Sequence, residues 1–295
     1  MKPKISELVK TGKILVSDGA WGTMLQAKGL EIGSCPELWN LTNSDDVFDV
    51  AKSYINAGAD LIETNSFGGS SIKLADYNLQ NQAFEINKKA VEISKKAAGQ
   101  NNYVIASMGP TGKFIFTGDV TEEELYNSFK EQALAFKVGG ADAVCIETFY
   151  AVDEAVCAIK AVKENTDLEI ICTFTFEVKA NGEFRTMMGV NAEEMINAIV
   201  PLGVDIIGTN CGNGFADMVE IVNEFRKFNS SIPILVHANA GLPEILDGNL
   251  VYPETPEKIK EIIPKLIKAG ANIIGGCCGT TPKHIAEIAK IVNGL

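Results

Sequence analysis

One short phrase recurs four times along the chain, and it constrains the fold more than any other feature. The copies lie at 57–62, 139–144, 202–207 and 269–274, each with glycine in second place and Asp or Asn in fourth place. Each copy follows an amphipathic stretch and opens an apolar run. We interpret it as a helix that ends at glycine, a tight turn, and a strand buried on both faces. This is the helix-to-strand joint of a parallel α/β protein.

Four further apolar runs lie between the repeats, at 14–17, 103–108, 169–176 and 232–238, so the chain is predicted to have eight strands. Helical patterns separate them at 44–58, 78–98, 121–139, 151–165, 191–202, 214–228, 255–270 and 281–293. Strict alternation over 295 residues favours an α/β fold of the (β/α)8 TIM-barrel type over a doubly wound sheet. We expect one domain that spans residues 1–295.

Composition and charge exclude several classes of protein. The chain has 26 Lys and Arg against 38 Asp and Glu, a formal charge of −12, which argues against nucleic-acid or anionic-membrane partners. Residues 1–13 carry no signal-peptide pattern, and no apolar run of about 18 residues occurs. We therefore predict a cytoplasmic protein without a membrane segment. Its seven cysteines are expected to be thiols, ligands or core residues rather than a disulfide framework.

The carboxyl ends of the strands are where a TIM barrel carries its catalytic groups. Aligning the four repeats places Asn65, Glu147, Asn210 and Cys277 in one column and Ser66, Thr148, Cys211 and Cys278 in the next. Residues of one column are expected at one height in the barrel. Cys211 and Cys278 should therefore converge at the mouth.

Cys277 can join these two thiols only if the backbone turns sharply, because neighbouring residues on a strand point to opposite faces. Gly275, Gly276 and Gly279 permit such a turn. Three thiolates with an open fourth position are typical of a catalytic zinc site, and we expect one Zn²⁺ per chain. The same residues also fit small-residue packing or a phosphate-binding turn, and these alternatives stay open.

The remaining cysteines and the two histidines are weaker candidates. Cys35, Cys145, Cys157 and Cys172 are expected to have core or incidental roles. His237 is a possible ligand near the end of its strand, although a core role suits it better. His284 is expected at the surface, in the first turn of the last helix.

A zinc ion held by three thiolates is a poor Lewis acid but can bind a fourth thiol as thiolate, so the pattern indicates S-alkylation of a thiol substrate. Carboxylates at the same mouth, Asp18 and Glu147, suit the ammonium group of an amino acid. Backbone N–H groups of the turn at 19–22 suit its carboxylate. Each carboxylate also has a structural alternative, an Asp-Gly turn at Asp18 and a buried ion pair at Glu147.

The motifs at these positions resemble those of the homocysteine S-methyltransferase family. They are Asp18-Gly-Ala-Trp-Gly-Thr, Asn210-Cys211, Asn239-Ala-Gly and Gly275-Gly-Cys-Cys-Gly-Thr-Thr-Pro-Lys-His, and the likeness extends along nearly the whole chain. The segments at 109–112, 147–149 and 239–253 are most similar to the amino-terminal homocysteine-binding domain of cobalamin-dependent methionine synthase.

This resemblance implies a zinc-bearing barrel that binds homocysteine through sulfur and converts it to methionine. It implies that Cys211, Cys277 and Cys278 ligate zinc, and that Asp18, Gly19, Ala20 and Glu147 hold the amino-acid end of the substrate. Asn239 matches a residue that can approach the metal when substrate is absent. These site assignments are expectations from the matched motifs.

The methyl donor stays open between three classes. The likeness favours a methylated corrinoid (methylcobalamin) carried by a partner, because the large synthases hold cobalamin and folate on further domains. A sulfonium such as S-methylmethionine and a quaternary amine such as betaine are the alternatives. Two other functions are also kept: a lyase or isomerase that binds phosphate at Gly275-Gly276, and a non-enzymatic homocysteine- or zinc-binding module. The oligomeric state is left open.

Overall fold

The computed structural model describes residues 2–246 and 249–294, and its centre is a sheet of eight strands. All its strand pairs are parallel, in the order β1-β12-β9-β8-β5-β4-β3-β2. These strands are β1 (Leu15–Val16), β2 (Leu61–Ile62), β3 (Tyr103–Met108), β4 (Ala143–Phe149), β5 (Glu169–Phe174), β8 (Ile206–Gly214), β9 (Ile234–Asn239) and β12 (Ile273–Gly276). The predicted α/β TIM-barrel fold is therefore confirmed.

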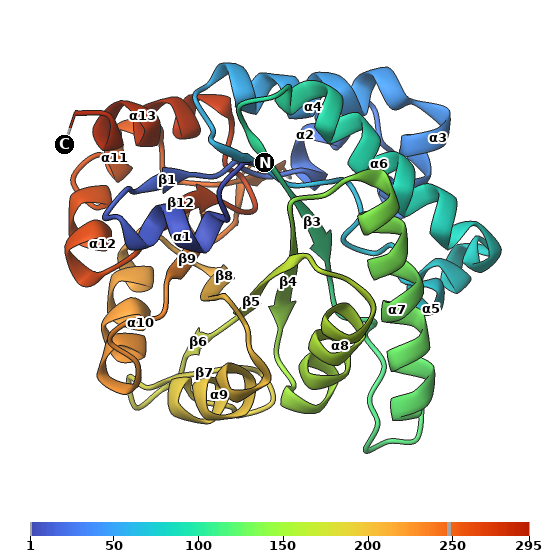
Figure 1. Ribbon diagram of the computed structural model, residues 1–295. Helices are drawn as coiled ribbons and strands as arrows, with labels where there is room; N and C mark the ends of the chain where they lie inside the picture. Colours follow the sequence, from blue (N-terminus) through green and yellow to red (C-terminus); the bar gives the residue numbers. More distant parts are fainter. Residues whose placement is uncertain (1, 247–248, 295) are drawn as a thin grey trace.

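Helices surround the strands, as Figure 1 shows. Those that alternate with the barrel strands are α4 (Ser44–Asn56), α6 (Ala83–Ala98), α7 (Glu122–Gly139), α8 (Val152–Asn165), α9 (Ala192–Ile199), α10 (Phe215–Phe228), α12 (Ile263–Ala269) and α13 (Pro282–Val292). Shorter helices are α1 (Ile5–Lys10), α2 (Gly22–Ala27), α3 (Trp39–Thr42), α5 (Ser71–Leu74) and α11 (Pro256–Ile259). No helix in the described part of the chain is long and apolar enough to cross a membrane.

The four repeats have one structural role. In each copy the glycine has a left-handed backbone, with φ between 86° and 111°, and ends the preceding helical segment. The following Asp or Asn then binds the strand before it twice. Asp205, for example, donates its backbone N–H to Ile170 O and accepts the Ile170 N–H on Oδ2, both at 2.9 Å. The same pair of bonds joins Asp60 to Val16, Asp142 to Val104, and Asn272 to Ile234.

The bonds of Asp60 have a further consequence, because they connect β1 to the start of β2 at the two ends of the sheet order. The repeat thus closes the barrel as well as ending helices.

Two apolar layers hold the fold together. The inner layer fills the barrel with Leu15, Leu61, Ile105, Ile171, Ile206, Leu235 and Ile273, and Ile5 and Val9 of α1 pack against it. The outer layer lies between strands and helices. At the amino-terminal end, Glu169 at the start of β5 accepts the backbone N–H of Ser6 at 3.1 Å. Helix α1 therefore covers that end of the barrel.

Several boundaries differ from the sequence prediction. The helix expected at 255–270 is split into α11 and α12, because Pro264 lacks an N–H and fits only the first turn of a helix. The helix expected at 191–202 ends at Ile199, and a 3-10 turn that contains Pro201 follows. Helix α6 starts at Ala83, later than the predicted 78.

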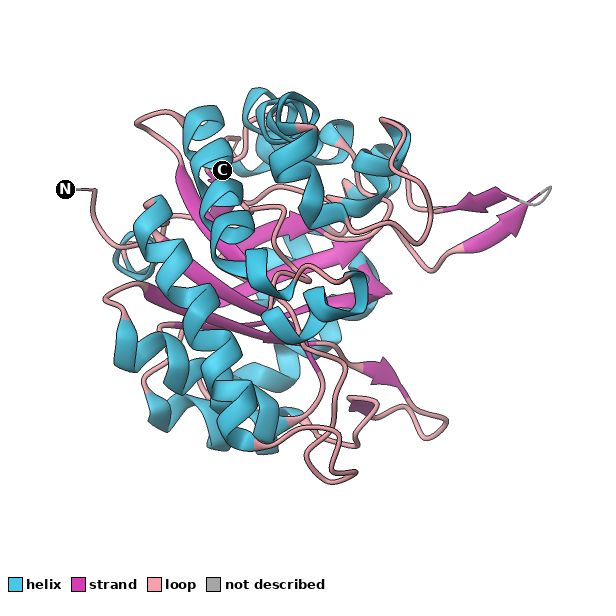
Figure 2. Ribbon diagram, turned by 90° about the vertical axis from the view of Figure 1, so that its right-hand side faces the viewer, coloured by secondary structure: helices cyan, strands magenta, loops and turns pink. Residues whose placement is uncertain are grey.

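Two β-hairpins were not predicted. The first pairs β6 (Glu177–Val178) with β7 (Phe184–Arg185), and the second pairs β10 (Glu244–Leu246) with β11 (Asn249–Val251). They follow β5 and β9, and Figure 2 shows both on the side toward which the barrel strands point. They lengthen the wall around the carboxyl ends of the strands.

Candidate metal centre and substrate cavity

Three thiols meet at the carboxyl ends of β8 and β12. The Sγ atoms of Cys211, Cys277 and Cys278 lie within 4.8 Å of one another, and all three residues are partly exposed. The other four cysteines are buried free thiols, and Cys145 and Cys172 belong to the apolar core. The structure therefore brings together the three cysteines that the repeat alignment singled out.

Cys211 reaches the cluster because β8 is irregular there. Its backbone is left-handed, with φ of 58°, and the pairing of β8 with β9 shifts between Asn210 and Gly214. Thr148, in the same column of the repeat, is also left-handed, with φ of 65°. Asn210 joins the two segments: it accepts the Thr148 N–H at 2.8 Å and donates to Thr148 Oγ1 at 2.7 Å. A β-branched residue and a cysteine are thus held in a conformation that costs about 1–3 kcal/mol each, which is typical of functional sites.

The chain turns sharply between Cys277 and Thr280, as the adjacent cysteines require. Thr280 donates its N–H to Cys277 O at 3.1 Å, and Gly279 lies in the left-handed region with φ of 78°. A Cβ on Gly276 would lie 2.3 Å from Thr280 Oγ1, so the turn packs tightly on the end of β12. Both Cys277 and Cys278 therefore direct sulfur to one point.

The three thiols share protons in favour of one thiolate. Hydrogen bonds from the thiols of Cys277 and Cys278 lower the pKa of Cys211 to about 3. The bonds to Cys211 raise the pKa of Cys277 well above its ordinary value and that of Cys278 to about 11. A soft divalent cation would displace the remaining two protons.

Asn239 contacts the thiol cluster. Its side chain donates to Cys211, while its Oδ1 is buried without a hydrogen-bond partner. The three clustered sulfurs fit the ligand preference of Zn²⁺ and leave a fourth position for an exchangeable ligand. The residues present thus fit the metal that the sequence motifs imply.

The thiol cluster forms one wall of a cavity of about 500 Å³. This volume suits a small molecule. The other residues on the wall include Gly19, Ala20, Trp21, Glu63, Ser66, Phe67, Ser107, Glu147, Thr148, His237 and Tyr252. No Lys or Arg occurs among the described residues that line it.

Glu147 lies on this wall, close enough to the thiols for their charges to interact. Ser107 Oγ donates to Glu147 Oε1, and Asn210 Nδ2 lies 3.3 Å from Oε2. Burial raises the pKa of Glu147 to about 7, although the Ser107 hydrogen bond opposes the shift, and the charges on Asp18 and Cys211 add to it. A cationic ligand group beside Glu147 would relieve this cost.

Asp18 has a different environment from the one expected. It is fully buried, and it does not belong to the cavity wall. Its Oδ2 accepts the indole N–H of Trp21 and the backbone N–H of Glu63, both at 2.9 Å, while burial raises its pKa to about 7. Asp18 therefore organises the turn that carries Gly19 and Ala20. Both of these do line the cavity, but the Ala20 N–H is already donated to Thr280 Oγ1 at 3.1 Å.

Glu63 and Tyr252 are among the wall residues that were not predicted from the sequence. Glu63 is buried beyond the end of β2, and Tyr252 precedes α11, with its ring so close to Gly279 that a Cβ there would lie 2.1 Å from it. Burial and the charge of Cys278 raise the pKa of Tyr252 to about 12. One signal pointed to Glu63: it lies two residues before Asn65, and alternate residues of a strand face the same side. No comparable signal existed for Tyr252.

The histidines also differ in part from expectation. His237 is buried on the cavity wall, where desolvation lowers its pKa to about 3 and keeps it neutral. His284 was expected at the surface, which was wrong. It is buried because its ring bonds the N–H of Thr281 at 3.1 Å and Glu254 O at 2.8 Å.

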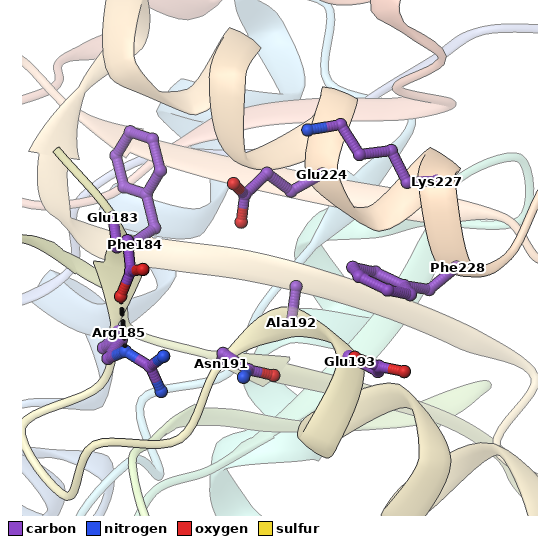
Figure 3. A pocket seen from close by; sticks show the side chains of 9 residues that line it. All are labelled: Glu183, Phe184, Arg185, Asn191, Ala192, Glu193, Glu224, Lys227 and Phe228. Atoms are coloured by element: carbon purple, nitrogen blue, oxygen red, sulfur yellow. Dashed lines mark hydrogen bonds and ion pairs between the residues drawn. The ribbon is translucent and has the colours of Figure 1, made fainter.

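A second, smaller cavity of about 180 Å³ lies beside hairpin β6–β7, between α9 and α10 (Figure 3). Its Arg185 and Glu183 pair with each other at 3.0 Å, and both are substantially exposed. None of the predicted site residues lines it. The candidate catalytic and binding residues are therefore found at the thiol cavity and not at this second one.

Known proteins are similar to this chain in sequence or in fold. The chain is 32% identical over 303 residues to methionine synthase of Mycobacterium tuberculosis (strain ATCC 25618 / H37Rv), and 33% identical over 298 residues to that of Mycobacterium leprae (strain TN). These alignments cover 97% and 95% of this chain but only 25% and 24% of the relatives. The chain thus spans about a quarter of the length of these two relatives.

The metallated form of the homocysteine methyltransferase MmuM from Escherichia coli has the same fold, with a TM-score of 0.78 and 22% identity over 96% of this chain and 98% of that one. The sequence pattern of the homocysteine S-methyltransferase family matches residues 15–292. Because this match includes every strand of the barrel and all three clustered cysteines, the chain belongs to the homocysteine S-methyltransferase family of enzymes.

Proposed function

We propose that this chain binds Zn²⁺ through Cys211, Cys277 and Cys278 and transfers a methyl group to the sulfur of homocysteine, giving methionine. One observation carries the proposal: the three sulfurs converge on the wall of a cavity that also contains the buried carboxylate of Glu147. A thiol site and a cation site thus share one small space. Homocysteine has a thiol at one end and an ammonium group at the other.

The chain's own residues divide the work of binding. Glu147 binds the ammonium group of the substrate. Ser107 and Asn210 hold the Glu147 carboxylate in place through hydrogen bonds. The substrate carboxylate lies against the turn at Gly19 and Ala20, which Asp18 holds through Trp21. Zinc at the cysteines would keep the homocysteine sulfur as thiolate near neutral pH. The sulfur then forms a bond to the methyl carbon as the bond between that carbon and the donor breaks.

The donor we propose is a methylated corrinoid carried by a partner protein or domain. Exposed apolar side chains lie in the segments that follow different barrel strands: Phe67 (43% exposed), which lines the cavity, and Phe116 (68%), Met187 (60%) and Ile245 (77%). Apolar exposure of this kind around a cavity suits docking of a second protein better than access by a small polar donor. The resemblance to cobalamin-dependent methionine synthase supports the same choice.

A betaine-type donor is less favoured. Trp21, Phe67 and Tyr252 lie on the cavity wall, but the Trp21 indole is bound to Asp18 and Phe67 is half-exposed. Phe149, the last residue of β4, packs against Phe129, and the next residue, Tyr150, packs against Phe114. These rings do not supply the closed aromatic cage typical of quaternary-amine sites.

The phosphate-binding alternative has no support in the turn on which it depended. Gly276 donates its N–H to Asp18 O at 2.8 Å, and Cys277 donates to Ala238 O at 2.7 Å. These backbone donors are therefore not free for a phosphate group.

We expect the enzyme to act in the cytoplasm, where a reducing environment keeps its cysteines available for zinc.

The test is to incubate the zinc-loaded chain with homocysteine and, separately, methylcobalamin, S-methylmethionine or betaine, and to measure methionine. We expect slow methylation by free methylcobalamin, faster methylation when a corrinoid protein presents it, and none with betaine. The Cys278→Ser variant should be inactive with every donor. Turnover with S-methylmethionine alone would replace the donor assignment, and binding of homocysteine without any methionine would favour the non-enzymatic module.

A further inference from the structure

Glu63 places a second buried carboxylate on the cavity wall beside Glu147. Glu63 follows β2, its side chain is 8% exposed, and its Oε1 atom has no hydrogen-bond partner. Ligand atoms of Glu63, Glu147 and His237 all lie within 4.8 Å of one another. Since nothing in the proposed function uses Glu63, this unpaired oxygen needs an explanation.

The surroundings of Glu63 lack a positive charge. His237 Nδ1 is 3.5 Å from Glu63 Oε1, but the buried imidazole stays neutral and its Nε2 also has no partner. Burial and the nearby charge of Glu147 raise the pKa of Glu63 well above its ordinary value. No Lys or Arg lies among the described residues of the cavity wall. In the empty cavity these raised pKa values favour the protonated carboxyls, and a ligand that brings a cation would compensate both groups in their charged form.

We propose that Glu63 is a specificity-determining residue that binds the α-ammonium group of the substrate together with Glu147. This inference rests on the proposed function and deepens it. An ammonium nitrogen forms charge-assisted hydrogen bonds of about 2.8 Å, so it can bridge two carboxylate oxygens that are less than about 5 Å apart. The spacing of Glu63 and Glu147 meets this condition. The site thereby selects thiols that carry an amino group.

The position of Glu63 is fixed before any ligand binds. Asp18 accepts its backbone N–H at 2.9 Å, and Ser94 donates to its backbone oxygen at 2.8 Å. The His237 ring beside it packs so closely on β12 that a Cβ on Gly275 would lie 2.9 Å from the ring. Little ordering is therefore required when the ammonium group enters.

The experiment compares two thiols on the zinc-loaded chain by calorimetry: L-homocysteine and 4-mercaptobutanoate, which lacks only the ammonium group. The Glu63→Gln variant should bind homocysteine about 10- to 100-fold more weakly than the unaltered chain, the loss expected for a charged hydrogen bond. Its affinity for 4-mercaptobutanoate should not fall. The ratio of the affinities for homocysteine and 4-mercaptobutanoate should therefore fall about 10- to 100-fold.

Controls separate this effect from damage to the fold or the metal site. Glu154→Gln alters another buried glutamate, which accepts bonds from Thr111 and does not line the cavity, and it should keep the full preference. Glu63→Asp keeps the charge but withdraws it, so its preference should be intermediate. If Glu63→Gln fails to fold by circular dichroism, the Glu63→Asp comparison provides the test.

Three outcomes contradict the inference. If Glu63→Gln keeps the preference for homocysteine, or loses affinity for both thiols equally, Glu63 does not contact the ammonium group. A second zinc per chain that disappears in Glu63→Gln assigns Glu63, Glu147 and His237 to a metal instead. By contrast, failure of the unaltered zinc-loaded chain to bind either thiol contradicts the proposed function itself.

Discussion

Asp18 Oδ2 accepts the backbone N–H of Glu63 at 2.9 Å, so a residue just beyond β1 holds the backbone of the glutamate that follows β2. The same oxygen holds the indole of Trp21 on the cavity wall. Asp18 thus influences the substrate cavity through two residues that line it, although its own carboxylate is fully buried.

This arrangement predicts that Asp18→Ala and Asp18→Asn differ in their KM for homocysteine. Asn keeps one oxygen acceptor, so Asp18→Asn should raise the KM for homocysteine only a few-fold, whereas Asp18→Ala should raise it about tenfold or more. Zinc content should stay constant in both. Steady-state kinetics decide the matter: an equally large loss in the two variants would indicate a direct ion pair between Asp18 and the substrate.

The metal site should depend on each clustered cysteine. Purified protein should contain close to one Zn²⁺ per chain, and Cys211→Ser, Cys277→Ser and Cys278→Ser should each lose most of it, because a hydroxyl is a poorer ligand than thiolate. Elemental analysis measures the content, with Cys157→Ala in helix α8 as the control that keeps zinc. Full zinc in all three serine variants would place the metal elsewhere.

Glu147→Gln should affect the substrate rather than the metal. Removal of the negative charge leaves the ammonium group without a partner, so we expect the KM for homocysteine to rise about 10- to 100-fold while zinc content is unchanged. Kinetics and metal analysis of the same preparation provide the check. Loss of zinc with an unchanged KM would mean that Glu147 supports the cysteine cluster instead.

Glu147 should also make stability depend on pH. Burial raises its pKa from the ordinary 4.5 to about 7, so between these values the folded chain keeps a proton that the unfolded chain has released. The stabilisation is present below pH 4.5 and is lost as the pH rises through about 7. Across this range the unfolding free energy should fall less steeply in Glu147→Gln than in the unaltered chain, by at most about 1.4 kcal/mol per pH unit. Urea unfolding of both metal-stripped proteins at pH 5, 6 and 7 measures the slopes, and parallel curves would argue against this assignment.

The repeated Asp predicts a matched pair of stability variants. Asp205→Asn should be nearly neutral, because Asn272 makes the same two bonds at the equivalent position of the fourth repeat. Asp205→Ala leaves the Ile170 N–H without its side-chain acceptor and should cost about 1–3 kcal/mol. Thermal unfolding compares the two. A loss in Asp205→Asn as large as in Asp205→Ala would show that charge, rather than the acceptor, matters.

Much of the fold was predictable from local patterns. Glycine at the helix end and Asp before an apolar run recur with one meaning, so the strands after Gly58, Gly140, Gly203 and Gly270 could be placed, and β3 was predicted with its observed bounds. The same periodicity placed Cys211 and Cys278 at equivalent heights. These features depend on backbone conformation and on strand alternation, which short segments of sequence determine by themselves.

Tertiary structure alone decided which neighbours each side chain has. Asp18 lies just after β1 and Glu147 near the end of β4, and both are buried, yet only Glu147 of the two lines the cavity. Glu63, His237 and Tyr252 reach that wall from segments far apart in the chain, and His284 is buried by Glu254, 30 residues away. No local pattern encodes such encounters, because burial and charge pairing depend on what the closed barrel packs against each residue.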